Sequence, residues 1–365
     1  MNSTFTPTNT TLEINNVLSH YDLGELVDYE VNERGFVNAA FAINTLLAGD
    51  CRRFFLRKYK RGVQEEELQF EHSLIDHLVT IGVPVAQILR TRAGLSYFHL
   101  QEGPADDPGI FYTIFDYLPG EDRFTWVDPR LTGAELSASG ALLARFHIAS
   151  AGFTPSGRRA EPKISELLPV IAETWFASPG RSRGTAFDAT LLEHFERVRE
   201  NINAAQAALA ELVSQSPPEI VIHCDYHPGN LKFQEQSIVG LFDFDWSKID
   251  LRAFDVALAL WYFCTAWQGA EDGHFRLEWA RTFLRAYTET LAAHPAAVPL
   301  TAAEIRYLPD LINAGNLYIL NWTLLDYFGK DVDPEEYLIF LKHSLNFTLW
   351  YERIENRAAL GDLLK

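Results

Sequence analysis

The pattern of apolar and polar positions changes several times in the first third of the chain. Residues 33–46 read as a turn followed by an alternating strand, and residues 51–59 read as its partner, so we expect a β-hairpin. In residues 65–78 the apolar positions recur at helical spacing, which predicts a helix. Residues 1–16 are polar and threonine-rich, and we expect them to form an N-terminal arm or to be poorly ordered. Further strands are expected around residues 87–90, 96–100 and 110–118.

The remainder of the chain is expected to be mainly helical. Residues 133–147 predict a long helix, and the helices expected after residue 255 are dense in aromatic residues, most of which we assign to the core. A chain of 365 residues is too long for a single small core and suits two lobes with one cleft. We expect an N-terminal lobe of residues 17–118 and a C-terminal lobe of residues 119–365.

The candidate chemistry lies where two short apolar runs each reach an acidic residue. The run at residues 220–222 and the run that ends at Asp243 read as strands, which would deliver carboxylates to one edge of a core. Between them, His223, Asp225 and Asn230 have the spacing His-x-Asp-x-x-x-x-Asn. Kinase-like enzymes use this spacing to place a base for the attacking hydroxyl and an amide oxygen for a metal ion.

The sequence His-Cys-Asp-Tyr-His-Pro-Gly-Asn-Leu from residue 223 resembles the catalytic loop of the aminoglycoside phosphotransferase and choline kinase superfamily, which includes a homoserine kinase type. Asp243 stands in the Phe-Asp-Phe context of the family's metal aspartate, and Asp255 matches an aspartate that opens the next helix and supports the loop. Cys224 stands where the family prefers glycine. The resemblance implies an α+β, protein-kinase-like, two-lobed fold. Its small mixed N-lobe would hold an antiparallel sheet, and its larger C-lobe would be mainly helical.

The same resemblance implies a reaction that uses ATP and Mg²⁺. Asp225, supported by His223 and Asn230, would be the catalytic group that orients the attacking hydroxyl, and Asn230 and Asp243 would hold the metal. The acceptor is expected to be the hydroxyl of a small molecule. A protein substrate is disfavoured because Asp243 runs into Asp245 and an expected helix, with no Asp-Phe-Gly and Ala-Pro-Glu segment between which a peptide could dock.

In the N-terminal lobe the resemblance assigns a nucleotide site. Gly35 and Asn38 match a Gly-x-x-Asn loop that covers the phosphates. The family strand ends in Leu-Lys, and the lysine binds the phosphates, but here Arg57 and Lys58 follow the leucine. Neighbouring side chains on a strand point to opposite faces, so only one of the two can enter the cleft easily. We favour Arg57, because the register places it at the position of the family lysine. Glu71, on the predicted helix, would be the partner of this cation.

The predicted strand that ends near residue 118 would become the hinge between the lobes. In the family the backbone of this connector reads the adenine edge, which here assigns the role to Phe115, Asp116, Tyr117 and Leu118. His147, in the long helix, is interpreted as a packed or capping histidine.

The sequence leaves the acceptor open. If the segment after Asp243 is extended, Asp245 points to the same side, and with Trp246 and Asp326 it would favour an amine-bearing alcohol such as homoserine, choline or an aminoglycoside. The alternative is that Asp245 caps a turn into the next helix and Trp246 packs beneath it. Two other functions stay open: a kinase of an uncharged sugar or polyol, and a catalytically silent nucleotide-binding module.

Charge and cysteine usage restrict the partners and the compartment. A formal net charge of −18 argues against non-specific binding to nucleic acid or to anionic membranes, and it permits a cationic substrate. The three cysteines are far apart and form no C-x-x-C pair, so we interpret them as reduced, buried thiols. The first residues have neither a basic start nor an apolar run, and no apolar run is long enough for a bilayer. We therefore expect a cytoplasmic protein.

Overall fold

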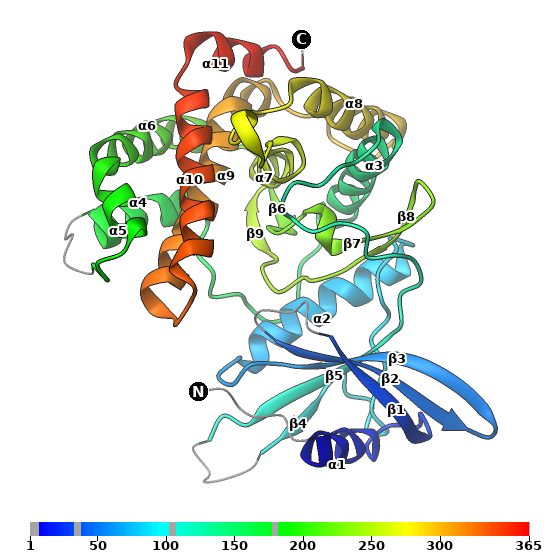
Figure 1. Cartoon of the computed structure of the whole chain (residues 1–365). Coiled ribbons are helices and arrows are strands. Elements are labelled where there is room, and N and C mark those ends of the chain that lie inside the picture. Colours follow the sequence, from blue (N-terminus) through cyan, green and yellow to red (C-terminus); the bar gives the residue numbers. More distant parts are fainter. Residues whose placement is uncertain (1–6, 33–37, 102–106, 177–181, 365) are drawn as a thin grey trace. The chain divides into compact units, whose positions relative to one another are not determined.

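The computed structural model describes residues 7–32, 38–101, 107–176 and 182–364, which form two compact units (Figure 1). Unit 1 contains the chain up to Gly120, joined by Thr154–Arg159 and Val239–Phe242, and unit 2 contains the remainder. The first unit boundary therefore lies two residues beyond the predicted division at 118/119. The sequence did not predict that the two short later segments belong to unit 1.

Unit 1 is built on a five-stranded antiparallel sheet in the order β1-β2-β3-β5-β4. The strands are β1 (Glu25–Asn32), β2 (Ala39–Leu47), β3 (Asp50–Lys58), β4 (Phe98–Leu100) and β5 (Ile110–Asp116). The predicted hairpin is the β2–β3 pair, with Ala39 opposite Lys58. Strand β1 was not predicted, and the strand expected at residues 87–90 is replaced by an isolated bridge from Ile88 to Phe115.

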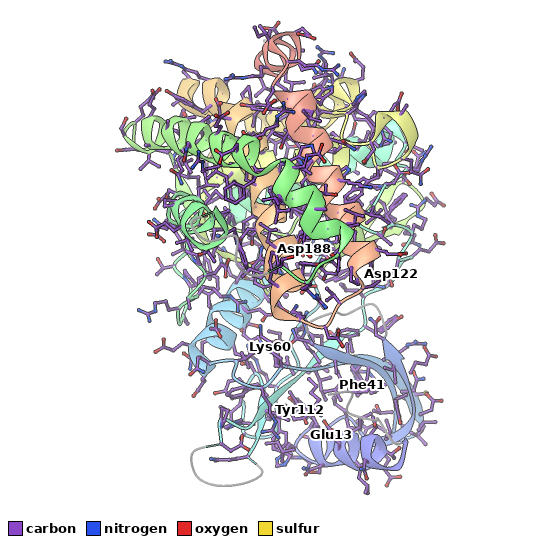
Figure 2. The ribbon with its side chains drawn as sticks, turned by 60° about the vertical axis from the view of Figure 1, so that its left-hand side comes forward. Glu13, Phe41, Lys60, Tyr112, Asp122 and Asp188 are labelled. Carbon is purple, nitrogen blue, oxygen red and sulfur yellow. The ribbon has the colours of Figure 1, made fainter. Side chains whose placement is uncertain are left out.

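A helix covers each face of this sheet (Figure 1). On one face lies α1 (Pro7–Leu18), whose Ile14, Val17 and Leu18 are buried in a core with residues of β2, β3 and β5. Figure 2 shows Glu13 of α1 beside Tyr112 of β5, whose hydroxyl donates to the Glu13 carboxylate. The expectation of a poorly ordered arm is therefore wrong for residues 7–16, because an apolar edge of that segment packs on the sheet.

The other face carries the predicted helix, α2 (Glu65–Thr80). Gln64 and Glu67 form a capping box at its start, and acidic residues in the first turn suit the positive end of the helix dipole. Leu68, Leu74 and Leu78 are buried, at the helical spacing that predicted the element.

Unit 2 is mainly helical. Its long helices are α3 (Gly133–Ser150), α4 (Ile164–Phe176), α6 (Phe195–Val213), α7 (Arg252–Cys264), α8 (Leu277–Ala293), α9 (Ala302–Gly329) and α10 (Pro334–Tyr351), with α5 (Ala186–Glu193) and α11 (Ile354–Gly361) as short ones. Helix α9 packs against α4, α6, α7, α10 and α11, while α3 packs along α8. Across the described residues we find no helix with the length and apolar character that membrane crossing requires.

Four short strands flank the candidate catalytic residues in the sequence. Strand β6 (Glu219–Ile222) pairs antiparallel with β9 (Lys248–Leu251), and β7 (Leu231–Gln234) pairs with β8 (Ser237–Leu241). The two apolar runs before His223 and Asp243 are β6 and β8, as predicted.

Candidate active site

The backbone of the loop that begins at His223 is hydrogen-bonded to one buried carboxylate, that of Asp255 in the first turn of α7. The backbone N–H groups of His223 and Cys224 donate to its two oxygens over 2.9 and 2.8 Å, and His147 Nε2 lies 3.0 Å from Oδ2. Burial raises the pKa of Asp255, but these hydrogen bonds and the nearby imidazoles outweigh it and hold the pKa below its usual range. The predicted supporting role of Asp255 and the packed position of His147 are both confirmed.

The backbone conformation of Cys224 explains why the family prefers glycine at this position. Its φ is +61°, in the left-handed region where a side chain is unfavourable and glycine is free of strain. The side chain is buried, and its Sγ lies 3.5 Å from the hydroxyl oxygen of Tyr318. Burial raises the pKa of the thiol, so Cys224 is an inert packing residue rather than a nucleophile. Cys264 is buried as well, but Cys51 is exposed, so the expectation of buried thiols is wrong for Cys51.

Asp225 follows this turn and is held at both carboxylate oxygens. Tyr262 donates its hydroxyl to Oδ1 over 2.9 Å, and Asn230 Nδ2 donates to Oδ2 over 3.0 Å. His227 Nε2 lies 3.5 Å from Oδ2. The side chain is 18% exposed, so it is oriented by the protein yet reachable by a substrate. Such a carboxylate can position a hydroxyl and accept its proton.

Sequence reasoning missed Tyr262. It lies seven residues after Asp255 on the same helix, and residues at that spacing share a helix face. With Asp255 expected beneath the loop, this spacing was the signal that could have placed Tyr262 against the loop as well.

His223 is fully buried, and its ring packs 4.9 Å from the ring of Phe244, measured between centroids. Burial lowers its pKa, although the carboxylates of Asp255, Asp225 and Asp243 act in the opposite direction. The imidazole is therefore neutral at physiological pH. Its burial suits support of the loop rather than contact with a substrate.

Asn230 has the chemistry expected of a metal ligand. Its Nδ2 donates to the backbone oxygen and to the carboxylate of Asp225, which fixes the orientation of the amide. Among the residues that the structure describes, none donates a hydrogen bond to Asn230 Oδ1. An oriented, uncommitted amide oxygen is a ligand type that Mg²⁺ accepts.

Asp243 is the second expected ligand, and its backbone is unusual. Its φ is +67°, a conformation that side chains rarely adopt and that occurs often at functional sites. Within the described ranges no group of three or more His, Cys, Asp or Glu side chains is arranged to hold a metal. Asn230 and Asp243 would supply one amide and one carboxylate oxygen, which are donor types that Mg²⁺ accepts beside phosphate oxygens, and their binding of metal stays a prediction.

Of the two geometries left open for Asp245, the extended segment is not observed. Because Asp243 has a positive φ and residues 245 and 246 form a turn, the segment is not extended, and the turn leads into β9 rather than directly into a helix. Trp246 packs against Trp322, with ring centroids 4.4 Å apart. Asp326 accepts from the Tyr337 hydroxyl and pairs with Lys330. A role for these residues in substrate binding stays a prediction.

In unit 1 the two basic residues at the end of β3 point to opposite faces of the sheet, as the alternation of side chains along a strand requires. Arg57 Nη1 lies 3.0 Å from Glu71 Oε1 on α2, whereas Lys58 Nζ lies 2.6 Å from Glu13 Oε1 on α1. Asn38 Oδ1 accepts from the backbone N–H of Lys60 over 2.9 Å. Gly35 lies outside the described residues. The pairing thus matches the predicted cation and its glutamate, while contact with phosphate stays a prediction.

The expected hinge begins where β5 ends. Phe115 is buried, and the N–H of Asp116 donates to the backbone oxygen of Gln87. Tyr117 is exposed, with the Arg53 guanidinium 4.7 Å from its ring centroid, and Leu118 is half-buried. The residues after Asp116 therefore leave the sheet as a connector, and their reading of adenine stays a prediction.

Replacing the two basic residues separately should give unequal results. We expect Arg57→Ala to raise KM for ATP and to lower turnover by roughly tenfold or more, because it removes the cation on the α2 face. Lys58→Ala should change either parameter less than about twofold, because its partner is on the opposite face. Steady-state kinetics with varied ATP would test this, and the reverse ranking would move the phosphate contact to Lys58.

Residues 28–298 match the phosphotransferase enzyme family. The homoserine kinase of Parvibaculum lavamentivorans is 30% identical over 348 residues, which cover 90% of this chain and 92% of that protein.

Two solved structures have a similar fold. A microcompartment-associated aminopropanol kinase has a TM-score of 0.65 at 18% identity, covering 96% of this chain and 98% of its own. An amicoumacin kinase in complex with AMP-PNP and Ca²⁺ has a TM-score of 0.66 at 15% identity, covering 94% and 93%. These matches confirm the α+β, kinase-like fold, and the alternative of a catalytically silent module is dropped. The chain belongs to the phosphotransferase enzyme family and is an ATP-dependent small-molecule kinase.

Proposed function

We propose that the protein transfers the γ-phosphoryl group of ATP to the hydroxyl of homoserine. The observation that carries the reaction type is the loop in which Asp225 is held between Tyr262 and Asn230. The choice of acceptor is supported by similarity along nine tenths of the chain to a homoserine kinase, and by the fold shared with an aminopropanol kinase, since both names denote amino alcohols.

The residues of unit 2 would perform the chemical step. Asp225 would orient the acceptor hydroxyl and accept its proton as the oxygen attacks phosphorus, while Tyr262 and Asn230 hold the carboxylate in place. Asn230 and Asp243 would hold magnesium, which offsets the negative charge of the phosphates when it is bound. Asp255 would keep the loop in its strained turn.

The residues of unit 1 would hold the nucleotide. Arg57, oriented by Glu71, would neutralise phosphate oxygens, and an arginine can do so through two parallel N–H groups. The loop around Gly35 and Asn38 would cover the phosphates, and the backbone at residues 115–118 would bind the base.

The two metal ligands can be tested without an acceptor. Asp243→Ala should weaken magnesium-dependent ATP binding by at least roughly tenfold, and Asn230→Ala should weaken it less, because an amide oxygen does not neutralise charge. Calorimetric titration of ATP with and without magnesium would measure this. Equal affinity of the wild type in the two conditions would contradict the metal assignment.

The acceptor is tested with alcohols that differ by one group. Homoserine should be phosphorylated with the highest kcat/KM. The kcat/KM should be lower for 4-hydroxybutyrate, which lacks the amino group, and for 3-aminopropanol, which lacks the carboxylate. Glycerol should have the lowest kcat/KM. Comparing wild type with Asp245→Asn on homoserine and 4-hydroxybutyrate would show whether Asp245 recognises the amine. If glycerol or a sugar is preferred, the acceptor is an uncharged polyol.

A further inference from the structure

Glu71 is shared by two arginines. Its side chain is 2% exposed, with Arg57 Nη1 3.0 Å from Oε1 and Arg159 Nη2 3.7 Å from Oε2. The Tyr59 hydroxyl donates to Oε2 over 3.3 Å. The side chains of Arg57 and Arg159 are themselves only 13% and 11% exposed. A single buried carboxylate thus has two nearly buried guanidinium partners, and only one of them is on the strand that the sequence motif identified.

Arg159 reaches this position because residues 154–159 return to unit 1 and lie against α2. The N–H of Arg158 donates to the Glu66 backbone oxygen over 3.1 Å, and the N–H of Ser156 donates to Ser73 Oγ over 2.9 Å. Gly157 has a φ of +76°, and a Cβ there would lie 2.2 Å from the Glu66 oxygen. This close contact fixes the segment on the helix, so Arg159 is placed by the backbone rather than by its ion pair alone.

Arg159 matters because the proposed function gives Arg57 two partners, the Glu71 carboxylate and the phosphates of ATP. The proposed function requires Arg57 to bind phosphate oxygens, which draws positive charge away from Glu71. A carboxylate buried without a compensating charge is strongly unfavourable. The neighbouring His72 cannot supply that charge near neutral pH, because burial together with Arg90, Arg57 and Arg159 lowers its pKa to about 3.

We propose that Arg159 is a positioning residue for nucleotide binding, which keeps Glu71 paired when Arg57 turns to the phosphates. This proposal depends on the assignment of Arg57 within the proposed function. It predicts that Arg159 contributes to ATP affinity without touching ATP, through the charge of Glu71.

The test compares neighbouring arginines. Arg159→Gln should raise the Kd for magnesium-AMP-PNP, measured by calorimetry without acceptor, by about tenfold, and Arg159→Lys should recover part of the loss. Arg158→Gln is the matched control, since the Arg158 side chain is exposed, and it should leave the Kd within about twofold of wild type. With acceptor present, KM for ATP should rise while KM for homoserine stays within about twofold.

A double-mutant cycle separates this mechanism from a loss of structure. Once Glu71→Gln has removed the buried charge, adding Arg159→Gln should change the Kd by less than about twofold. An unchanged Kd in Arg159→Gln, or an equal loss in the presence and absence of the Glu71 carboxylate, would overturn the proposal. If Arg159→Gln does not fold, Arg159→Lys in the two backgrounds decides the question.

The binding assay contains no acceptor, so it does not depend on the choice of homoserine. Failure of homoserine phosphorylation with intact, Arg159-dependent nucleotide binding would reject the substrate alone. Nucleotide binding that is insensitive to Arg159 but needs Arg57 would reject this inference alone.

Discussion

Replacing Asp225 by asparagine is expected to lower kcat by ~10²–10⁴-fold, the usual contribution of a positioned general base. The structure indicates that the loss will be chemical rather than structural. The asparagine amide can donate to the Tyr262 hydroxyl, which then acts as an acceptor, while its oxygen still accepts from Asn230. The side chain can therefore keep both contacts, although the Tyr262 hydroxyl proton loses its acceptor, but it no longer accepts a proton from the substrate.

The measurement is turnover at saturating ATP and homoserine, with the Kd for AMP-PNP as the control for the nucleotide site. Tyr262→Phe should show a smaller loss, about tenfold, because Asp225 keeps its carboxylate and loses only one orienting bond. A loss below tenfold in Asp225→Asn, with the true acceptor, would remove Asp225 from the role of base.

Replacing Asp255 by asparagine is expected to destabilise the protein by about 1–3 kcal/mol, the usual cost of leaving a buried hydrogen-bond donor without an acceptor. Asp255 accepts on both oxygens, from the N–H groups of His223 and Cys224, and it has His147 Nε2 within 3.0 Å. An asparagine would direct an NH₂ group at one of these donors, which would then be buried without an acceptor. The strained turn at Cys224 would lose its restraint, so activity should fall as well.

Denaturant unfolding monitored by circular dichroism would measure this loss, with the exposed Asp331→Asn as the matched control. The pKa of Asp255 is below its usual range, so its contribution is present above the unfolded-state pKa, near 4, and is lost as the pH falls through the folded-state pKa. The wild-type advantage over the variant should therefore shrink in strong acid. Equal stability of the two proteins at neutral pH would show that Asp255 does not hold the loop.

Local patterns predicted much of the fold. Helix α2 has the apolar spacing of residues 65–78, and the β2–β3 hairpin lies where the strands of residues 33–46 and 51–59 were expected. The alternation of side chains along a strand separated Arg57 from Lys58, because consecutive side chains must point to opposite faces. These features depend on neighbours in sequence, which is why the chain alone indicates them.

The errors occurred where local preference was overridden by packing. Residues 7–16 are polar on average, but Ile14 and the apolar residues that follow bind α1 to the sheet. For the segment after Asp243 the sequence left an extended strand and a turn open, and the structure has a turn, with a positive φ at Asp243. Neither effect is visible in a short window, because each is decided by contacts with distant residues or by backbone strain that the rest of the fold sustains.

The sequence by itself determined the loop from His223 to Asn230, the acidic residue after the next strand and the supporting Asp255, since their spacing is short and their chemistry specific. Only the tertiary structure decided that Tyr262 orients Asp225 and that Arg159 shares Glu71 with Arg57. Tyr262 lies 37 residues after the carboxylate it binds, and Arg159 reaches Glu71 by returning to a unit that the chain had already left. Such contacts depend on how helices and segments pack after the chain has folded. The spacing of Tyr262 from Asp255 indicates only a shared helix face, and no spacing along the sequence specifies the contact of Arg159 with Glu71.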